Sequence, residues 1–122
     1  MVELIYEKYA GNIRLHEPFE CKDIDLEESL KNILAISNGI EETMIHPKTN
    51  ETMAIAWIVY SYDEMCRETL FYKENYGING TVFSDDGAGN PYYLFEGKVY
   101  QFVVIDGESE FVAETLEIFF NK

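Results

Sequence analysis

Basic residues are scarce in this sequence: nine lysines and arginines stand against 23 aspartates and glutamates, which gives a formal net charge of −14. A surface with such a field repels the phosphates of nucleic acids and the headgroups of anionic membranes, so we expect neither nucleic acid nor membrane as a partner. The same field speeds encounters with basic proteins. Solubility alone also explains an acidic surface, and the charge by itself does not separate the two interpretations.

Cysteine and histidine are equally rare. Cys21 and Cys66 lie far apart and make no disulfide framework, and together with His16 and His46 they lack the spacing of a zinc site. We therefore expect no metal and no cofactor. Neither histidine has a serine, cysteine or acid at a catalytic spacing, and although distant residues can assemble a triad, we expect a protein that is not an enzyme.

Long hydrophobic runs are also missing. No stretch approaches the roughly 20 apolar residues of a membrane-spanning helix. The first eight residues carry acids and no apolar run, so the sequence predicts no signal peptide and a cytoplasmic location. At 122 residues, 47% of them hydrophobic, the chain is long enough for one folded domain over 1–122 with a real core, and too apolar to be disordered.

Hydrophobic periodicity and turn residues predict the elements of the first two thirds of the chain. They are a helix over 2–10, an irregular connector over 11–23, a helix capped by Asp25 and ended by Asn38-Gly39, a surface loop over 39–52, a strand over 53–60 and a helix from Ser61 to Gly77. Asp25 and Glu28 have the spacing of a capping box. The strand is apolar on both alternating faces, which predicts a position near the middle of a sheet, covered on both sides. Tyr62, Met65, Cys66, Leu70 and Tyr76 share one stripe of the helix, predicted to be buried.

The last third of the chain predicts three strands and a helix. They are a strand over 81–84, a hairpin of strands 92–95 and 98–105 across Glu96-Gly97, and a helix capped by Ser109 that packs through Val112, Leu116, Phe119 and Phe120. The order of elements favours an α+β fold, with a mostly antiparallel sheet of about four strands and helices packed around it.

The glycine-rich turn over 85–91 resembles a ligand loop, but its context argues against one. A nucleotide loop needs a helix after its glycines, whereas Pro91–Phe95 is predicted to be a strand, and Asp85 and Asp86 would repel phosphate. A calcium loop needs alternating oxygen ligands, and Gly87 stands where the second of them belongs. The composition therefore predicts a turn whose Asp and Asn side chains bond its own backbone.

Three segments carry a resemblance to a known family. They are LKNILAISNGI (30–40), a helix that ends in Asn-Gly; FSDDGAGN (83–90), a strand that enters an acidic glycine turn; and GKVY (97–100), followed by the closing helix to Phe119-Phe120. In this order, over residues 26–120, the chain resembles the SUKH superfamily, the SMI/KNR-like family of fungal cell-wall regulators and bacterial immunity proteins.

The resemblance implies a non-enzymatic α+β protein, and for bacterial members one that binds and blocks a cognate toxin, often a nuclease. A basic toxin would suit the acidic surface of this chain, since charge complementarity raises the association rate. The resemblance transfers no contact residue. From the sequence itself, the candidate partner-binding residues are Asp85, Asp86, Glu64, Glu68, Glu41 and Glu42.

Two other functions fit the same sequence. One is a regulatory or scaffold module that binds proteins but no toxin, as the eukaryotic members of the family suggest. The other is a small enzyme or ligand-binding protein with a pocket near Trp57, Tyr60 and Tyr92-Tyr93. The sequence is compatible with a monomer or a homodimer.

Overall fold

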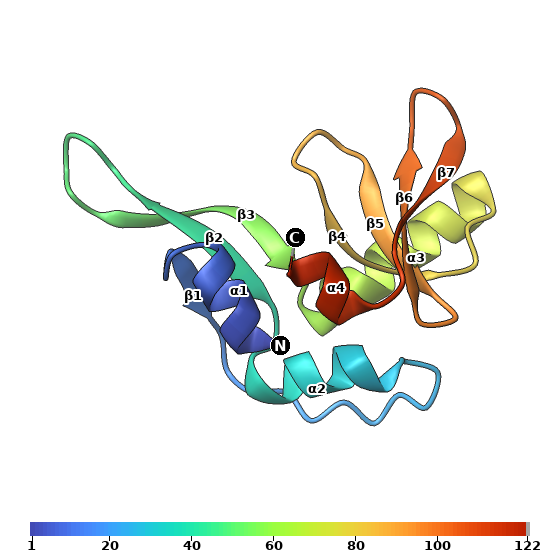
Figure 1. The fold of residues 1–122 in the computed structure, drawn as a ribbon, viewed down its shortest axis with the longest axis horizontal. Helices are drawn as coiled ribbons and strands as arrows, with labels where there is room; N and C mark the ends of the chain where they lie inside the picture. The colour runs from blue at the N-terminus through green and yellow to red at the C-terminus, as the bar shows by residue number, and fades with distance from the viewer. Residues whose placement is uncertain (122) are drawn as a thin grey trace.

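The computed structural model describes residues 1–121, which form four helices and seven strands. The order is α1 (Val2–Lys8), β1 (Ile13–Leu15), α2 (Glu28–Ile36), β2 (Ile40–Ile45), β3 (Thr52–Val59), α3 (Tyr62–Tyr76), β4 (Thr81–Asp85), β5 (Pro91–Phe95), β6 (Lys98–Val103), β7 (Glu108–Ala113) and α4 (Leu116–Phe120) (Figure 1). The strands build two antiparallel sheets, β1-β2-β3 and β4-β5-β6-β7. The fold is therefore α+β, as predicted, but its strands form two sheets rather than one.

A backbone hydrogen bond joins the two sheets between β3 and β4. The backbone N–H of Tyr60, just after β3, donates to the carbonyl oxygen of Phe83 in β4 at 2.8 Å. Away from this bond the two strands diverge, and the β2–β3 hairpin projects from the body of the molecule (Figure 1). Helix α3 packs against β4, where the Thr69 hydroxyl accepts a hydrogen bond from the Val82 N–H at 2.9 Å. The separation of β3 from β4 creates the site described below.

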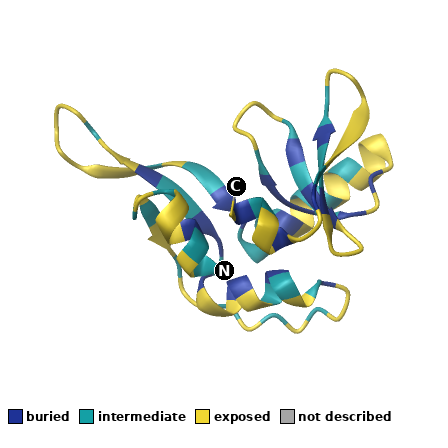
Figure 2. Cartoon of the chain, viewed as in Figure 1, coloured by how far each residue is buried: buried dark blue, intermediate teal, exposed yellow. Residues whose placement is uncertain are grey.

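The core fills the space between the sheets and the helices. Figure 2 shows the buried residues at the centre of the molecule and the exposed ones at the hairpin tips. Phe83 is fully buried and meets Phe119 and Phe120 of α4 edge to face, with ring centroids 5.7 and 6.4 Å apart. Such aromatic pairs stabilise beyond the area that they bury. They fix α4 beside the end of β4.

The segment over 39–52, predicted to be a loop, contains strand β2. Its sequence, IEETMI, contains a polar run and no alternation of apolar residues, and it becomes a strand because β3 pairs with it, Glu42 opposite Ala56 and Met44 opposite Met53. Strand β3 itself was predicted to be central and covered, and this is wrong. It lies at the edge of its sheet, and its first half is largely exposed.

The closing segment over 109–120 was predicted to be one helix capped by Ser109, and this is also wrong. Its first half is strand β7, in which Phe111 pairs with Tyr100 and Ser109 with Phe102 of β6. The helix is only α4, capped by the Thr115 hydroxyl, which accepts a hydrogen bond from the Ile118 N–H at 3.1 Å. Pairing along a neighbouring strand overrides the helical spacing here.

Helix ends were predicted with mixed success. Ser61 caps α3 as expected, its hydroxyl accepting from the Glu64 N–H at 3.3 Å, and the helix ends at Gly77. Asp25 does not cap α2, whose N-cap is Glu27, because Asp25 belongs to a separate turn in which its N–H bonds the Asp23 carboxylate at 3.0 Å. Of the predicted stripe of α3, only Met65 is fully buried, while Cys66, Leu70 and Tyr76 are exposed.

Candidate functional site

A groove of about 390 Å³ lies where β3 and β4 diverge, and we call it the acidic groove. It is lined by Lys8 of α1 and Tyr9 just after it, Glu42 of β2, Ala56, Trp57 and Ile58 of β3, Ser84 and Asp85 of β4, Asp86 and Gly87 of the following turn, Tyr92 of β5, Val112 of β7, and Phe119 and Phe120 of α4. Three carboxylates therefore line it against one ammonium group. The groove is a product of the fold, since five strands and two helical segments contribute to it.

Asp85 stands at the end of β4 and is fixed by two hydrogen bonds. Its Oδ2 accepts from the Tyr60 hydroxyl at 2.5 Å and its Oδ1 from the Gly87 N–H at 2.7 Å. Burial first, and then the bond to Asp85, raise the pKa of Tyr60, so this phenol stays a neutral donor. The carboxylate is thereby held in one orientation at the wall of the groove.

Asp86 serves the turn that follows. It accepts hydrogen bonds from the Ala88 and Asn90 N–H groups at 2.8 and 3.2 Å, from the Asn90 amide at 3.0 Å and from the Gln101 amide at 3.1 Å. Burial acts to raise the pKa of Asp86, but the hydrogen bonds prevail and lower it. The Asp side chains thus bond the backbone of their own turn, as predicted, whereas the Asn90 side chain bonds the Asp86 carboxylate and accepts from the Val104 N–H at 3.0 Å. Asp86 therefore contributes charge to the groove from a rigid position.

Glu42 enters the groove from the opposite sheet, at the position on β2 that pairs with Ala56. The negative potential between the two walls of the groove also affects two tyrosines. Burial and then Glu42 raise the pKa of Tyr9, and burial, Asp86 and Asp85 raise the pKa of Tyr92. Among the described residues that line the groove, Lys8 alone is basic, and its Nζ lies 5.8 Å from the centroid of the Phe119 ring. The groove therefore favours a cationic occupant.

Glu64 and Glu68 lie one helical turn apart on α3 and extend this acidic region beyond Asp85. Burial, then Glu64 and Asp85, raise the pKa of Glu68, while Arg67 acts in the opposite direction. The Arg67 guanidinium donates to the Glu64 carboxylate at 2.8 Å. Four of the predicted residues, Asp85, Asp86, Glu64 and Glu68, thus lie in one acidic region. Glu42, a fifth predicted residue, lines the same groove from the other sheet.

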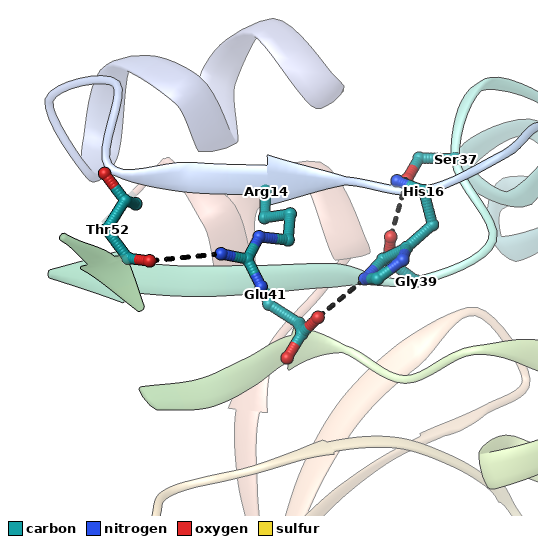
Figure 3. A network of polar contacts seen from close by, with 6 residues as sticks. All are labelled: Arg14, His16, Ser37, Gly39, Glu41 and Thr52. Atoms are coloured by element: carbon teal, nitrogen blue, oxygen red, sulfur yellow. Dashed lines mark hydrogen bonds and ion pairs between the residues drawn. The ribbon is translucent and has the colours of Figure 1, made fainter. Parts of the chain in front are cut away.

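Glu41, the sixth predicted residue, turns to the other face of β2, because successive side chains of a strand alternate. Its carboxylate bonds the His16 Nε2 at 2.7 Å, and the His16 N–H donates to the Ser37 hydroxyl at 2.7 Å (Figure 3). The Ser37 hydroxyl in turn donates to the Gly39 carbonyl oxygen. Glu41 and His16 therefore join β1 and the end of α2 to β2, which is a structural role.

The Asn38-Gly39 pair connects this network to the groove. The Asn38 side-chain oxygen accepts a hydrogen bond from the Tyr62 N–H at 2.8 Å, at the start of α3. Gly39 has a φ of +95°, and a Cβ there would lie 2.6 Å from the Trp57 ring. The pair thus sets the start of α3 and lets Trp57, one wall of the groove, pack against the chain.

The predicted ligand pocket near the aromatic residues is found only in part. Trp57 and Tyr92 line the groove, but Tyr60 is buried beneath Asp85, and the Tyr93 hydroxyl donates instead to Ser109 at 2.7 Å. Tyr9 was not predicted as a site residue, nor was Lys8. No sequence signal marks them, because their role depends on where α1 lies.

Within residues 1–121, no three His, Cys, Asp or Glu side chains converge in an arrangement that could hold a metal ion. Over the same residues, every helix is too short or too polar to span a lipid bilayer.

Comparison with known proteins identifies a family. The family model described as SMI1 / KNR4 family (SUKH-1) matches residues 20–122, a range that contains everything from α2 to α4 and the three segments on which the resemblance rests. No curated protein and no solved structure matches the chain. Helix α1, and with it Lys8 and Tyr9 at the groove, lies outside the matched range.

Proposed function

Because the chain belongs to the SMI1 / KNR4 family (SUKH-1), we propose that it is a protein-binding domain without catalytic activity, an immunity protein that neutralises a basic toxin. The observation that carries the proposal is the acidic groove, where Glu42 and Asp85 oppose each other across two sheets and Lys8 is the single basic residue among the described residues of the lining. A groove with this charge fits a lysine or arginine side chain of a partner.

The surrounding charge supports the same partner. Glu64 and Glu68 enlarge the acidic region beside Asp85, and the whole chain carries a net charge of −14. Complementary fields speed association and select against acidic competitors, and this matters for an inhibitor that must bind before its toxin acts. Nuclease-type toxins are the class we favour, because proteins that bind nucleic acid carry basic surfaces.

Affinity capture followed by a rescue assay tests the proposal. The tagged protein is used to capture partners from the lysate of its native cells, which are eluted with a salt gradient and identified. Each basic partner is then expressed in a susceptible bacterial host, alone and together with this chain, and surviving colonies are counted. We expect one stoichiometric basic partner that is toxic alone and harmless when the chain is present.

The control replaces charge without changing size. Glu42→Gln with Asp85→Asn removes two charges from the groove, while Glu108→Gln with Glu110→Gln removes two from exposed positions of β7 that do not line it. Rescue should fail with the first pair and persist with the second. If captured partners are harmless when expressed alone, the toxin proposal is wrong and the chain is a regulatory binding module.

A further inference from the structure

Strand β3 presents a free backbone edge. In residues 1–121 it pairs with β2 on one side only, and on its other side the bonds from Tyr60 to Phe83 and Asp85 of β4 lie beyond the end of the strand. The carbonyl oxygen of Thr52 accepts a hydrogen bond from the Arg14 guanidinium at 3.5 Å, but the outward N–H and C=O groups from Met53 to Val59 are available along most of the strand. Such an edge is a template for another extended chain.

This edge lacks the usual protection against pairing. Natural sheets shield edge strands with lysine, proline or a covering element, yet β3, TMAIAWIV, has no charged residue and no proline. Two bulges, at Ile55 and Ile58, bend the strand without covering it. Met53 and Ile55 are 41% and 48% exposed, so apolar side chains flank the open edge.

The free edge leads directly into the acidic groove. Ala56, Trp57 and Ile58 of β3 form one wall, and Asp85 stands on the other. A strand laid beside β3 would direct every second side chain to the same face, because side chains alternate along a strand. One of these side chains would enter between Glu42 and Asp85.

We propose that the free edge of β3 binds an extended segment of a basic partner by strand addition, with a lysine or arginine side chain of that segment in the acidic groove. The proposal takes its choice of a basic protein from the proposed function and adds the mode of binding. A second copy of this chain is a poor occupant, since pairing β3 with β3 would bring together two chains that each carry a net charge of −14.

A peptide probe tests the mode of binding without the natural partner. The probe is a ten-residue peptide in which lysine alternates with valine and threonine, and its affinity is measured by calorimetry. Two further peptides carry backbone N-methyl groups on one or the other alternate set of residues. All three have the same charge, so a purely electrostatic attraction binds them equally, whereas strand addition requires the N–H groups of one edge only.

We expect the unmodified peptide and one methylated peptide to bind, and the other methylated peptide to lose at least tenfold in affinity. Amide NMR signals of residues 53–58 should shift on binding. Ile55→Lys, which places a charge at the edge, should weaken binding about tenfold, while Leu15→Lys, on β1 and equally exposed at 48%, should leave it unchanged.

Three results would overturn the proposal: no binding of the peptide, equal binding of all three peptides, or dimerisation of the chain through β3 in sedimentation analysis. Failure here leaves the proposed function intact, because a toxin can be captured and neutralised through another part of the acidic surface. Conversely, strand addition without any toxin among the captured partners would retain the binding mode and remove the immunity function.

Discussion

A methyl group at Gly39 probes how the end of α2, the start of α3 and the groove wall are joined. Gly39 adopts a φ of +95°, and a Cβ placed there lies 2.6 Å from Cζ3 of Trp57 and 2.9 Å from the backbone nitrogen of Ser61. Carbon atoms in contact are normally about 3.5–4.0 Å apart. Gly39→Ala therefore forces either the Trp57 ring or the start of α3 to move.

The expected loss in the free energy of unfolding has two parts. Holding an alanine in the left-handed region costs about 1 kcal/mol. Overpacking against a fixed ring and backbone typically adds about 1–3 kcal/mol. Gly39→Ala should thus lower the free energy of unfolding by about 2–4 kcal/mol, a large share of the roughly 5–15 kcal/mol of a typical domain. For a chain of this length the melting temperature should fall by about 4 °C for each kcal/mol.

Urea unfolding followed by fluorescence measures this loss, and Trp57, the single tryptophan, reports on the affected site. Gly87→Ala is the matched control. Gly87 has a similar φ of +82°, but no atom lies within 4 Å of a Cβ there, so only the backbone part applies. A Gly39→Ala protein as stable as Gly87→Ala, or more so, would show that Trp57 and Ser61 do not restrict this position.

Three further substitutions test the surroundings of Asp85. Tyr60→Phe removes the hydroxyl that donates to the Asp85 carboxylate, and should lower the free energy of unfolding by about 2 kcal/mol in urea titrations; an unchanged midpoint would contradict the role of this bond. Glu68→Gln should stabilise the protein at neutral pH by a few tenths of a kcal/mol after solvent screening. Burial, and then neighbouring carboxylates, raise the pKa of Glu68, so the wild type recovers this stability as the pH falls through the raised pKa, and the two proteins should converge in melting scans at acidic pH. Asp86→Asn should destabilise the protein above about pH 4, because the hydrogen bonds of the turn lower the pKa of Asp86 against the effect of burial. The stability that the ionised carboxylate contributes to the wild type is lost as the pH falls through the lowered pKa. A difference between the two proteins that persists in acid would contradict this role of the carboxylate.

Features set by a few neighbouring residues were predictable from the sequence. The cap at Ser61, the end of α3 at Gly77 and the hairpin across Glu96-Gly97 follow from local side-chain chemistry and turn preferences. The turn at Asp85 and Asp86 was predictable for the same reason, and it located one wall of the groove.

Features that depend on pairing between distant strands were not predictable. Strand β2 contains Glu41, Glu42 and Thr43, a polar run that is a strand only because β3 lies beside it in register. In β7, Val112 has a helical spacing with Leu116 and the phenylalanines after it, but pairing with β6 determines the structure. Glu42 could not be placed opposite Asp85 for the same reason, since their approach requires both sheets.

If the acidic groove binds a basic partner, the charges of the groove determine the dissociation constant of the captured partner, which is measured across a range of salt concentrations. Three proteins are compared: wild type, Glu42→Gln with Asp85→Asn, and Glu108→Gln with Glu110→Gln. Binding in the groove requires that the groove pair weaken binding at least tenfold and flatten the salt dependence, while the β7 pair binds as the wild type does. Equal binding by all three proteins would contradict it.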